Sequence, residues 1–267
     1  MLEMSMLQVA FSGLALVAVL AFCTWLASLV QADVSLVDRL WPVFIAGAAL
    51  TYFVLLRPDG ARARWMLALV LVWGLRLCFY ITRRNWGHGE DRRYQTIRAR
   101  NQPNFAFKSL YLVFALQTLL AWAVAMPFLP GFASTQPLGA LDMAGIVLAC
   151  VGIAFEAIGD AQMSGFKADP ANKGRVMDRG LWRYTRHPNY FGEACAWWGL
   201  WLLAVGGAGL GAAWTVLSPL LMTVLLLKVS GVSLLEKDIG DRRPAYRDYI
   251  LRTPAFVPWL PRDKGTR

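Results

Sequence analysis

Seven apolar runs, each with few or no charged residues, constrain this chain more than any other feature. A helix needs about 20 apolar residues to cross a hydrocarbon core of about 30 Å, and all but one of the runs are long enough. The runs lack the alternation of strands, and in lipid every backbone amide must be bonded within the structure, which leaves helices. The sequence therefore predicts an all-α, polytopic membrane protein that forms a single domain over residues 1–267. Its seven transmembrane helices are expected at Leu7–Val30, Trp41–Leu56 (the short run), Trp65–Thr82, Ser109–Phe128, Leu141–Met163, Asn189–Val205 and Ala212–Leu235.

Positive charge gathers in three segments outside these runs. The formal net charge is +10, from 27 Lys and Arg against 17 Asp and Glu. In a membrane chain, anionic headgroups or a phosphate-bearing cofactor explain this excess better than nucleic acid does. The positive-inside rule places Arg83–Lys108, Ser164–Pro188 and the tail from Glu236 in the cytoplasm, with the N-terminus outside. The loop Arg57–Arg64, with three arginines on the outer side, argues against this orientation.

Ionisable residues also occur within or near the ends of the runs, where each costs roughly 2.5–3.5 kcal/mol at mid-membrane. Glu156 and Asp160 are four residues apart and share one helix face, and Asn189 and Glu193 have the same spacing. One interpretation is a structural ion-pair network, for example between Arg76 and Asp160. The other is a polar cavity open to the cytoplasm that holds a large ligand. Phosphates on that ligand would explain a basic cluster, whose members are Lys167, Lys173, Arg175, Arg179, Arg183 and Arg186.

Two motifs are more specific than composition. Residues Gly180–Glu193 place Arg-His-Pro just before a predicted helix, where Pro188 suits the first position and the free amides form an anion site. Residues Arg84–Tyr94 read Arg-Asn-Trp-Gly-His-Gly-Glu-Asp-Arg-Arg-Tyr. With parts of the tail, these motifs resemble the membrane reductases related to steroid 5-alpha-reductase, specifically a bacterial branch of uncharacterised members. The resemblance covers most of the chain from about Asp38 onward.

This resemblance implies a seven-helix protein of the bacterial inner membrane with a cytoplasmic NADPH cavity in its C-terminal half, about residues 73–267. Hydride would pass to a conjugated carbon–carbon double bond of a lipid-soluble substrate, such as a 3-oxo-Δ4-steroid or another enone lipid. No metal is expected. The positions that match the family's cofactor contacts are Arg76, Tyr80, Asn85, Asp160, Lys167, Arg175, His187, Asn189, Tyr190, Glu193, Lys228 and Arg247.

Departures from the family pattern leave the proton donor open. The steroid enzymes polarise the substrate carbonyl with a glutamate on the second span and a tyrosine on the third. Here the second run has no carboxylate, and Trp73 stands in the place of that tyrosine. The catalytic candidates are Glu193, Asp38 and Tyr80, with Tyr190 as a further phenol. Asp38 is at least as well explained as an interfacial cap of the second helix.

A second enzyme class carries a similar motif. Membrane methyltransferases that act on prenylated cysteine or phospholipid also have Arg-His-Pro before a helix, followed by an acidic tail motif, and they bind S-adenosylmethionine. This chain has a single glutamate, Glu236, where those enzymes usually have two. It also has the loop Arg84–Tyr94, which they lack, so the reductase is favoured. A non-enzymatic lipid-binding or scaffold protein is a third interpretation.

Overall fold

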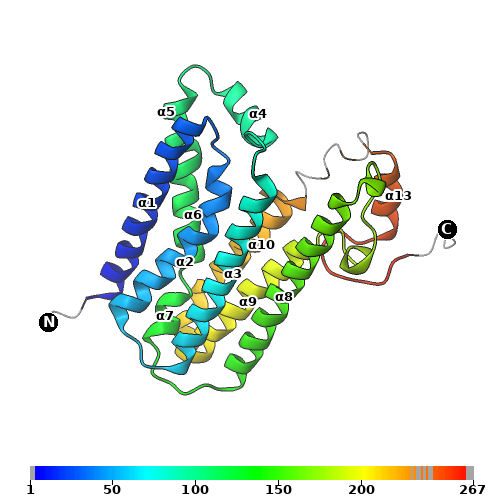
Figure 1. Ribbon diagram of the computed structural model, residues 1–267. Coiled ribbons are helices and arrows are strands. Elements are labelled where there is room, and N and C mark those ends of the chain that lie inside the picture. Colours follow the sequence, from blue (N-terminus) through cyan, green and yellow to red (C-terminus); the bar gives the residue numbers. More distant parts are fainter. Residues whose placement is uncertain (1–3, 230, 233–235, 237–238, 240–242, 263–267) are drawn as a thin grey trace. The chain divides into compact units, whose positions relative to one another are not determined.

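The computed structural model describes residues 4–229, 231, 232, 236, 239 and 243–262, and every element in these ranges is helical. Figure 1 shows their order along the chain. The elements are α1 (Met6–Gln31), α2 (Leu36–Leu56), α3 (Ala61–Asn85), α4 (Arg92–Arg100), α5 (Phe105–Ser109), η1 (Leu110–Ala115), α6 (Leu116–Val124), α7 (Phe128–Ala133), α8 (Ala140–Ala168), η2 (Pro170–Asn172), η3 (Gly180–Arg183), α9 (Pro188–Ala208), η4 (Gly209–Val216), α10 (Leu217–Val224), η5 (Leu225–Val229) and α13 (Ala245–Arg252).

Six helical stretches in the described residues are long and apolar enough to cross a membrane. For the described residues, this confirms the prediction of an all-helical chain with candidate membrane-spanning helices. Five predicted spans each match one stretch, and the short second run is lengthened because α2 begins at Leu36. The stretches are Met6–Gln31, Leu36–Leu56, Ala61–Asn85, Phe105–Ala133, Ala140–Ala168 and Pro188–Lys228.

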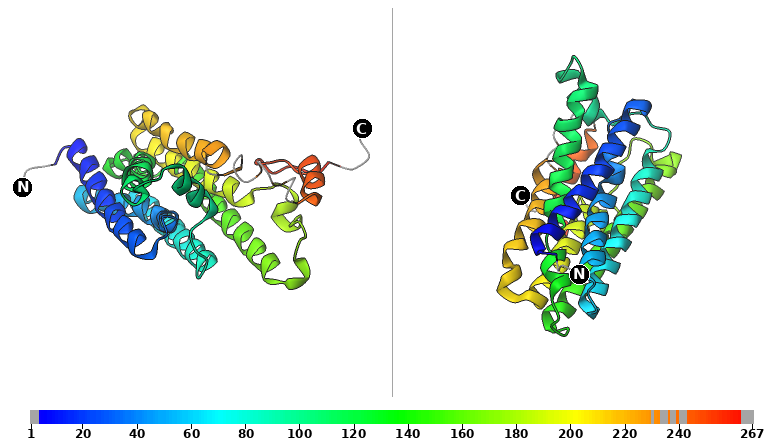
Figure 2. Two further views of the ribbon diagram at one scale, coloured as in Figure 1. Left: turned by 90° about the horizontal axis from the view of Figure 1, so that it is seen from above. Right: turned by 90° about the vertical axis from the view of Figure 1, so that its left-hand side faces the viewer.

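The last stretch covers most of the two remaining predicted spans. Pro188–Lys228 has 41 residues, which as one straight helix would be about 60 Å long, about twice a hydrocarbon core. The α-helix ends at Ala208, and Gly209 adopts a left-handed φ of 57°. After η4 the chain turns back, and α10 lies beside α9 (Figure 2). The indole of Trp198 on α9 donates a hydrogen bond to Thr223 Oγ1 on α10 at 3.3 Å. The predicted span Ala212–Leu235 runs on into residues 230 and 233–235, which lie outside the described ranges.

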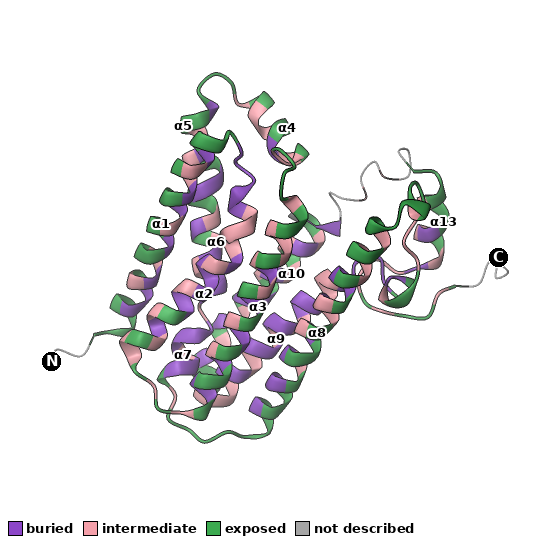
Figure 3. Cartoon of the chain, viewed as in Figure 1, coloured by how far each residue is buried: buried purple, intermediate pink, exposed green. Residues whose placement is uncertain are grey.

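The chain forms two compact units. The first comprises Met1–Met143 with Leu202–Ser218, and the second comprises Ala144–Trp201 with Pro219–Arg267. Figure 3 shows that buried and exposed residues alternate along the long helices. Many of the exposed residues are large and apolar, for example Leu7, Val72 and Val147. In the first unit, α1 approaches α2 where Gly13 leaves room for the ring of Tyr52: a Cβ at Gly13 would lie 2.3 Å from a ring carbon. Small residues thus let these membrane helices approach closely.

A buried ion pair in the first unit corrects one expectation from the sequence. Arg57–Arg64 was expected to be a loop, but α3 already begins at Ala61, and Arg62 points inward. Its guanidinium donates to both carboxylate oxygens of Asp142, at 2.6 and 2.9 Å, and to three backbone carbonyls and Ser134 Oγ. The charge of Arg62 is therefore neutralised inside the protein. Arg62 should not be counted when the positive charges of the loops on the two sides of the membrane are compared.

In the second unit, α8 and α9 run antiparallel with their backbones in contact. A Cβ at Gly152 on α8 would lie 2.5 Å from the carbonyl oxygen of Gly192 on α9, and a Cβ at Gly192 would lie 2.5 Å from the amide of Glu156. Nothing larger than hydrogen fits at either position without moving the helices apart. This contact brings the end of α8 that carries Glu156 and Asp160 beside the first turns of α9.

Candidate functional site

The Arg-His-Pro motif lies at the start of α9 in the second unit. Pro188 is the first residue of the helix, which confirms the expected start. The two residues before it, Arg186 and His187, are both buried. Both contact the carboxylate of Glu236, the single glutamate at the place where the membrane methyltransferases usually have two.

Arg186 and Glu236 form a two-pronged ion pair. Arg186 Nε donates to Glu236 Oε1 at 2.7 Å, and Nη2 donates to Oε2 at 2.8 Å. The remaining nitrogen, Nη1, donates to the carbonyls of Ile250, at 3.2 Å, and Thr253. Burial alone would raise the pKa of Glu236, but the hydrogen bonds and charges of His187 and Arg186 lower it to about 2. The guanidinium of Arg186 is thus fully engaged inside the protein, which corrects its earlier grouping with the possible phosphate ligands.

His187 is held between Glu236 and Tyr190. Its Nε2 lies 3.0 Å from Glu236 Oε1, and its ring stacks on that of Tyr190 with centroids 5.4 Å apart and planes 4° from parallel. Because the pKa of Glu236 is so low, its carboxylate only accepts, and Nε2 therefore carries the hydrogen.

The C-terminal tail holds this motif in place. The amide of Arg186 donates to the carbonyl of Pro254 at 2.9 Å, and Thr185 Oγ1 donates to that of Phe256 at 2.8 Å. The amide of Trp259 donates to the carbonyl of Tyr184 at 3.0 Å. The segment 254–259 therefore runs beside residues 184–186 and fixes the backbone from which His187 projects.

Four further polar residues belong to the same end of the α8–α9 pair. Glu156 and Asp160 on α8, and Glu193 on α9, are buried. Asn189, in the first turn of α9, has an amide oxygen that is buried and has no hydrogen-bond partner among the described residues. A buried acceptor of this kind calls for a donor from a ligand or from water.

The predicted phosphate ligands are on the surface of the same unit. Lys167 lies in the last turn of α8, and the next four cations follow between α8 and α9. Arg247 is exposed on α13, and Lys228 is exposed in η5. The four exposed cations between the helices are Lys173, Arg175, Arg179 and Arg183.

The other predicted site residues belong to the first unit. Arg76 and Tyr80 are partly exposed on α3, and Asn85, the last residue of α3, accepts a hydrogen bond from Arg84 Nε at 3.0 Å. The structure therefore divides the predicted residues into two sets. Within the second unit, the predicted residues on α8 and in the first turns of α9 are brought together at one end of that helix pair.

Asp38 does not act as a helix cap. It lies in the first turn of α2, whose N-cap is Ser35. Its carboxylate accepts from Arg93 Nη2 and from Tyr94 OH, both at 2.7 Å. Asp38 is thus an anchor for the loop Arg84–Tyr94, because two residues of that motif bind it.

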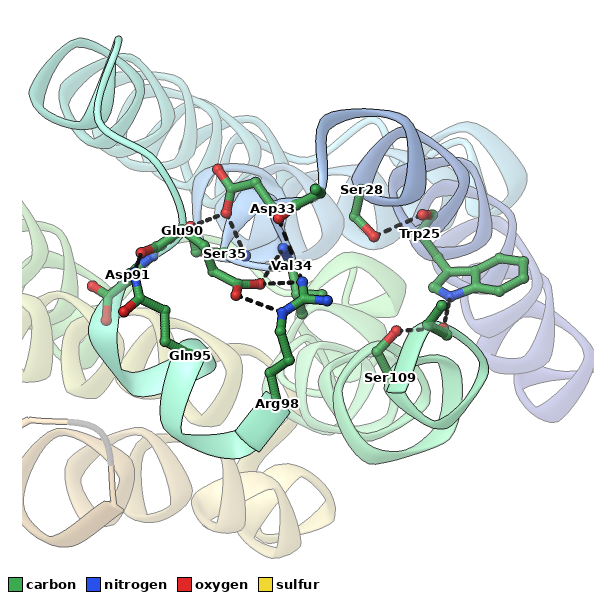
Figure 4. A network of polar contacts seen from close by, with 12 residues as sticks. Trp25, Ser28, Asp33, Val34, Ser35, Glu90, Asp91, Gln95, Arg98 and Ser109 are labelled. Carbon is green, nitrogen blue, oxygen red and sulfur yellow. Dashed lines mark hydrogen bonds and ion pairs between the residues drawn. The ribbon is translucent and has the colours of Figure 1, made fainter. Parts of the chain in front are cut away.

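The rest of that motif is fixed by a polar network at the α1–α2 turn (Figure 4). Glu90 accepts from the amide of Val34 at 3.0 Å and from Arg98 Nη2 at 2.7 Å. Burial alone would raise the pKa of Glu90, but the hydrogen bonds from Arg98 and Val34 lower it. Glu90 therefore holds the loop onto the turn before α2, while Arg93 and Tyr94 hold it onto Asp38 of α2. Among the described residues, no group of three or more His, Cys, Asp and Glu is placed to hold a metal ion.

The sequence alone did not predict the contact of Arg186 with Glu236 or the close contact between α8 and α9 at their glycines. A signal for the interface is present, because glycines recur every seven residues in both helices. They are Gly145, Gly152 and Gly159 in α8, and Gly192, Gly199 and Gly206 in α9. The Arg186–Glu236 pair left no such signal, since 50 residues separate its members.

Comparison with known proteins identifies relatives of unknown activity. A family model described as "Protein of unknown function (DUF1295)" matches residues 24–253. A Schizosaccharomyces pombe protein named "Uncharacterized protein C594.04c" is 25% identical over 274 aligned residues, which cover 93% of this chain and 79% of that protein. Since this relative comes from fission yeast, the expected bacterial branch is too narrow a description. No solved structure matches the chain.

Proposed function

We propose, from the premise that this chain belongs to the DUF1295 family, a steroid 5-alpha-reductase-like family, that it is an NADPH-dependent membrane oxidoreductase. It reduces an activated carbon–carbon double bond of a lipid-soluble enone. The observation that carries the proposal is the set of buried polar groups at one end of the α8–α9 pair, followed directly by exposed cations. Seven spans, an outer N-terminus, a cytoplasmic cofactor site and, in a bacterium, an inner-membrane location are part of the proposal.

The residues of the second unit fit the chemistry of NADPH. Its phosphates carry negative charge, and Lys173, Arg175 and Arg179 are exposed cations that suit them. Asp178, which is close to these cations in the sequence, lies 3.5 Å from Arg252. At the other end of the cofactor, a carboxamide NH₂ is a donor, and the buried oxygen of Asn189 is an acceptor that has no partner among the described residues.

NADPH, when bound, supplies the hydride that adds to the β-carbon of the enone. The protein must then stabilise the charge that develops on the carbonyl oxygen and deliver a proton. Glu193, buried one turn after Asn189, is the proposed hydrogen-bond donor in its protonated form. Asp38 suits this role less well, because it already accepts hydrogen bonds from Arg93 and Tyr94. Tyr80 and Tyr190 are the phenolic alternatives.

His187 positions the start of α9 in this scheme. Its link to Glu236 and its stacking on Tyr190 fix the first turn of the helix, on which Asn189 also lies. A fixed first turn holds the side-chain amide of Asn189 and the carboxyl group of Glu193 at constant positions. This favours catalysis, because little reorganisation is then needed to reach the transition state.

The test uses purified protein in lipid nanodiscs. We expect NADP⁺ to raise the melting temperature and NADPH to be oxidised when an enone lipid is added. Glu193→Gln should lower turnover while leaving the dissociation constant for NADP⁺ nearly unchanged, since its role is in the transition state. Loss of binding in parallel with turnover would assign Glu193 to the cofactor site. Absence of any NADP⁺ effect on the parent protein would refute the reductase.

One observation favours a methyltransferase as the second candidate. Glu236 closes onto Arg186 and His187, an arrangement that suits an Arg-His-Pro motif followed by an acidic tail residue. S-adenosylmethionine carries a positive sulfonium and no phosphate. Its binding should therefore respond weakly to salt, whereas binding of a dinucleotide phosphate by surface cations weakens as salt rises. Stabilisation by S-adenosylhomocysteine alone would establish this alternative.

A further inference from the structure

The tail exposes large apolar side chains among cations. Four such side chains occur within ten residues, and the largest, Trp259, is 74% exposed. Arg247 and Arg262 are exposed in the same part of the chain, and Arg252 is partly exposed. The four apolar residues are Leu251, Val257, Trp259 and Leu260. Large apolar side chains that are exposed within one short segment, next to cations, are a feature of interaction surfaces.

Aromatic contacts fix the depth of this surface relative to the membrane helices of its own unit. Phe256 packs edge-on against Phe191, in the first turn of α9, with ring centroids 5.8 Å apart. Phe191 packs in turn against Phe155 on α8 at 5.6 Å. Both α8 and the stretch that begins with α9 are apolar enough to span a membrane. Val257–Leu260 therefore lies where α9 enters the bilayer.

The backbone places a second exposed aromatic residue at the same level. The amide of Trp259 donates to the carbonyl of Tyr184, whose side chain is also exposed. Tryptophan and tyrosine are enriched at the boundary between headgroups and hydrocarbon, where one end of the side chain is apolar and the other is wet. Arginines at this level are attracted by anionic headgroups.

We infer that residues 251–262 are a membrane-surface anchor, which seats the tail on the anionic leaflet of the bilayer that the chain spans. The apolar side chains enter the headgroup–acyl boundary, and Arg247 and Arg262 face lipid phosphates. The same segment holds Thr185 and Arg186 by hydrogen bonds to Phe256 and Pro254. Lipid composition is thereby coupled to the order of the Arg-His-Pro motif. This inference does not depend on the chemistry proposed for the site.

The test places a polarity-sensitive fluorophore on the tail of the full-length protein in nanodiscs. Trp259→Cys is labelled in a background in which Cys23, Cys78, Cys150 and Cys195 are replaced by alanine. Lys173→Cys, exposed in the same unit, is the matched control. At position 259 we expect blue-shifted emission, protection from an aqueous quencher and quenching by a shallow lipid spin label, all stronger with anionic lipid. At position 173 we expect full access of the aqueous quencher.

Arg262→Gln tests the electrostatic part. One cation near an anionic surface changes the ratio of protected to accessible label by about fivefold, so the variant should lose about that factor in anionic nanodiscs only. If the cysteine-free protein fails to fold, hydrogen exchange of residues 251–262 in the native chain should slow when anionic lipid is added. Equal quencher access at 259 and 173, or exchange indifferent to lipid, would overturn the inference. Protection that rises with protein concentration would do so too, since it points to a second copy.

Discussion

Replacing Glu236 by glutamine tests whether the tail glutamate holds the Arg-His-Pro motif together. The carboxylate accepts from both prongs of Arg186 and from His187, at 2.7, 2.8 and 3.0 Å. Glutamine has the same shape but no charge and only one acceptor oxygen. The variant therefore leaves the buried guanidinium of Arg186 without its counter-charge, while its bonds to the carbonyls of Ile250 and Thr253 persist.

Two estimates give similar values for the stability that Glu236→Gln should lose. The pKa of Glu236 falls from an ordinary 4.5 to about 2, and at about 1.36 kcal/mol per pH unit this is about 3 kcal/mol of stability at neutral pH. Removing one partner of a buried ion pair costs about 3–5 kcal/mol, and the carbonyls that Arg186 keeps favour the lower end. For a protein of this size, about 3 kcal/mol corresponds to a melting temperature lower by about 6–12 °C.

The assay is thermal unfolding in detergent, followed by tryptophan fluorescence, for the parent and Glu236→Gln. Asp178→Asn is the control, because Asp178 and Arg252 form a long pair at 3.5 Å on the surface and should contribute less than about 1 kcal/mol. The stabilising effect of Glu236 is complete above about pH 5 and disappears as pH falls toward 2, because the folded-state pKa is the depressed one. The difference between parent and variant should therefore shrink as the solution is acidified. A variant that melts like Asp178→Asn, or a difference that persists unchanged to pH 3, would refute the reasoning.

Three further predictions follow from single contacts. Gly192→Ala should destabilise the protein by about 1–3 kcal/mol, since its Cβ would lie 2.5 Å from backbone atoms of α8, while Gly165→Ala, with open space around it, should be neutral or stabilising in the same melting assay. Arg62→Ala should cost about 3–5 kcal/mol by stranding Asp142 in the interior, and Arg62→Ala/Asp142→Ala should recover part of that loss; a double variant as unstable as the two single losses combined would contradict an ion pair. Arg175→Ala should raise the dissociation constant for NADPH more than that for NADH, measured by titration in nanodiscs, because only NADPH carries the additional phosphate; equal losses would remove Arg175 from phosphate recognition.

Hydrophobic length alone determined much of the fold. Apolar runs such as Leu7–Val30 and Leu141–Met163 specify their helices locally, because a lipid solvent forces each segment to satisfy its own backbone. The start of α9 at Pro188 was equally local, since proline fixes φ and needs no amide partner there. Composition could not resolve the stretch Pro188–Lys228, where the turn back depends on Gly209 and on the bond between Trp198 and Thr223.

For the candidate site, the sequence by itself supplied the residue types and their order. It indicated that Asn189 and Glu193 share a face, that cations follow α8, and that Arg186 and His187 precede a helix. Only the tertiary structure decided which charges are used internally. Arg62 and Arg186 read as surface charges in the sequence, yet each is buried against an acid at least 50 residues away. Such pairs form because a charge removed from water needs a counter-charge at about 3 Å, and no local pattern states which distant chain segment will deliver it.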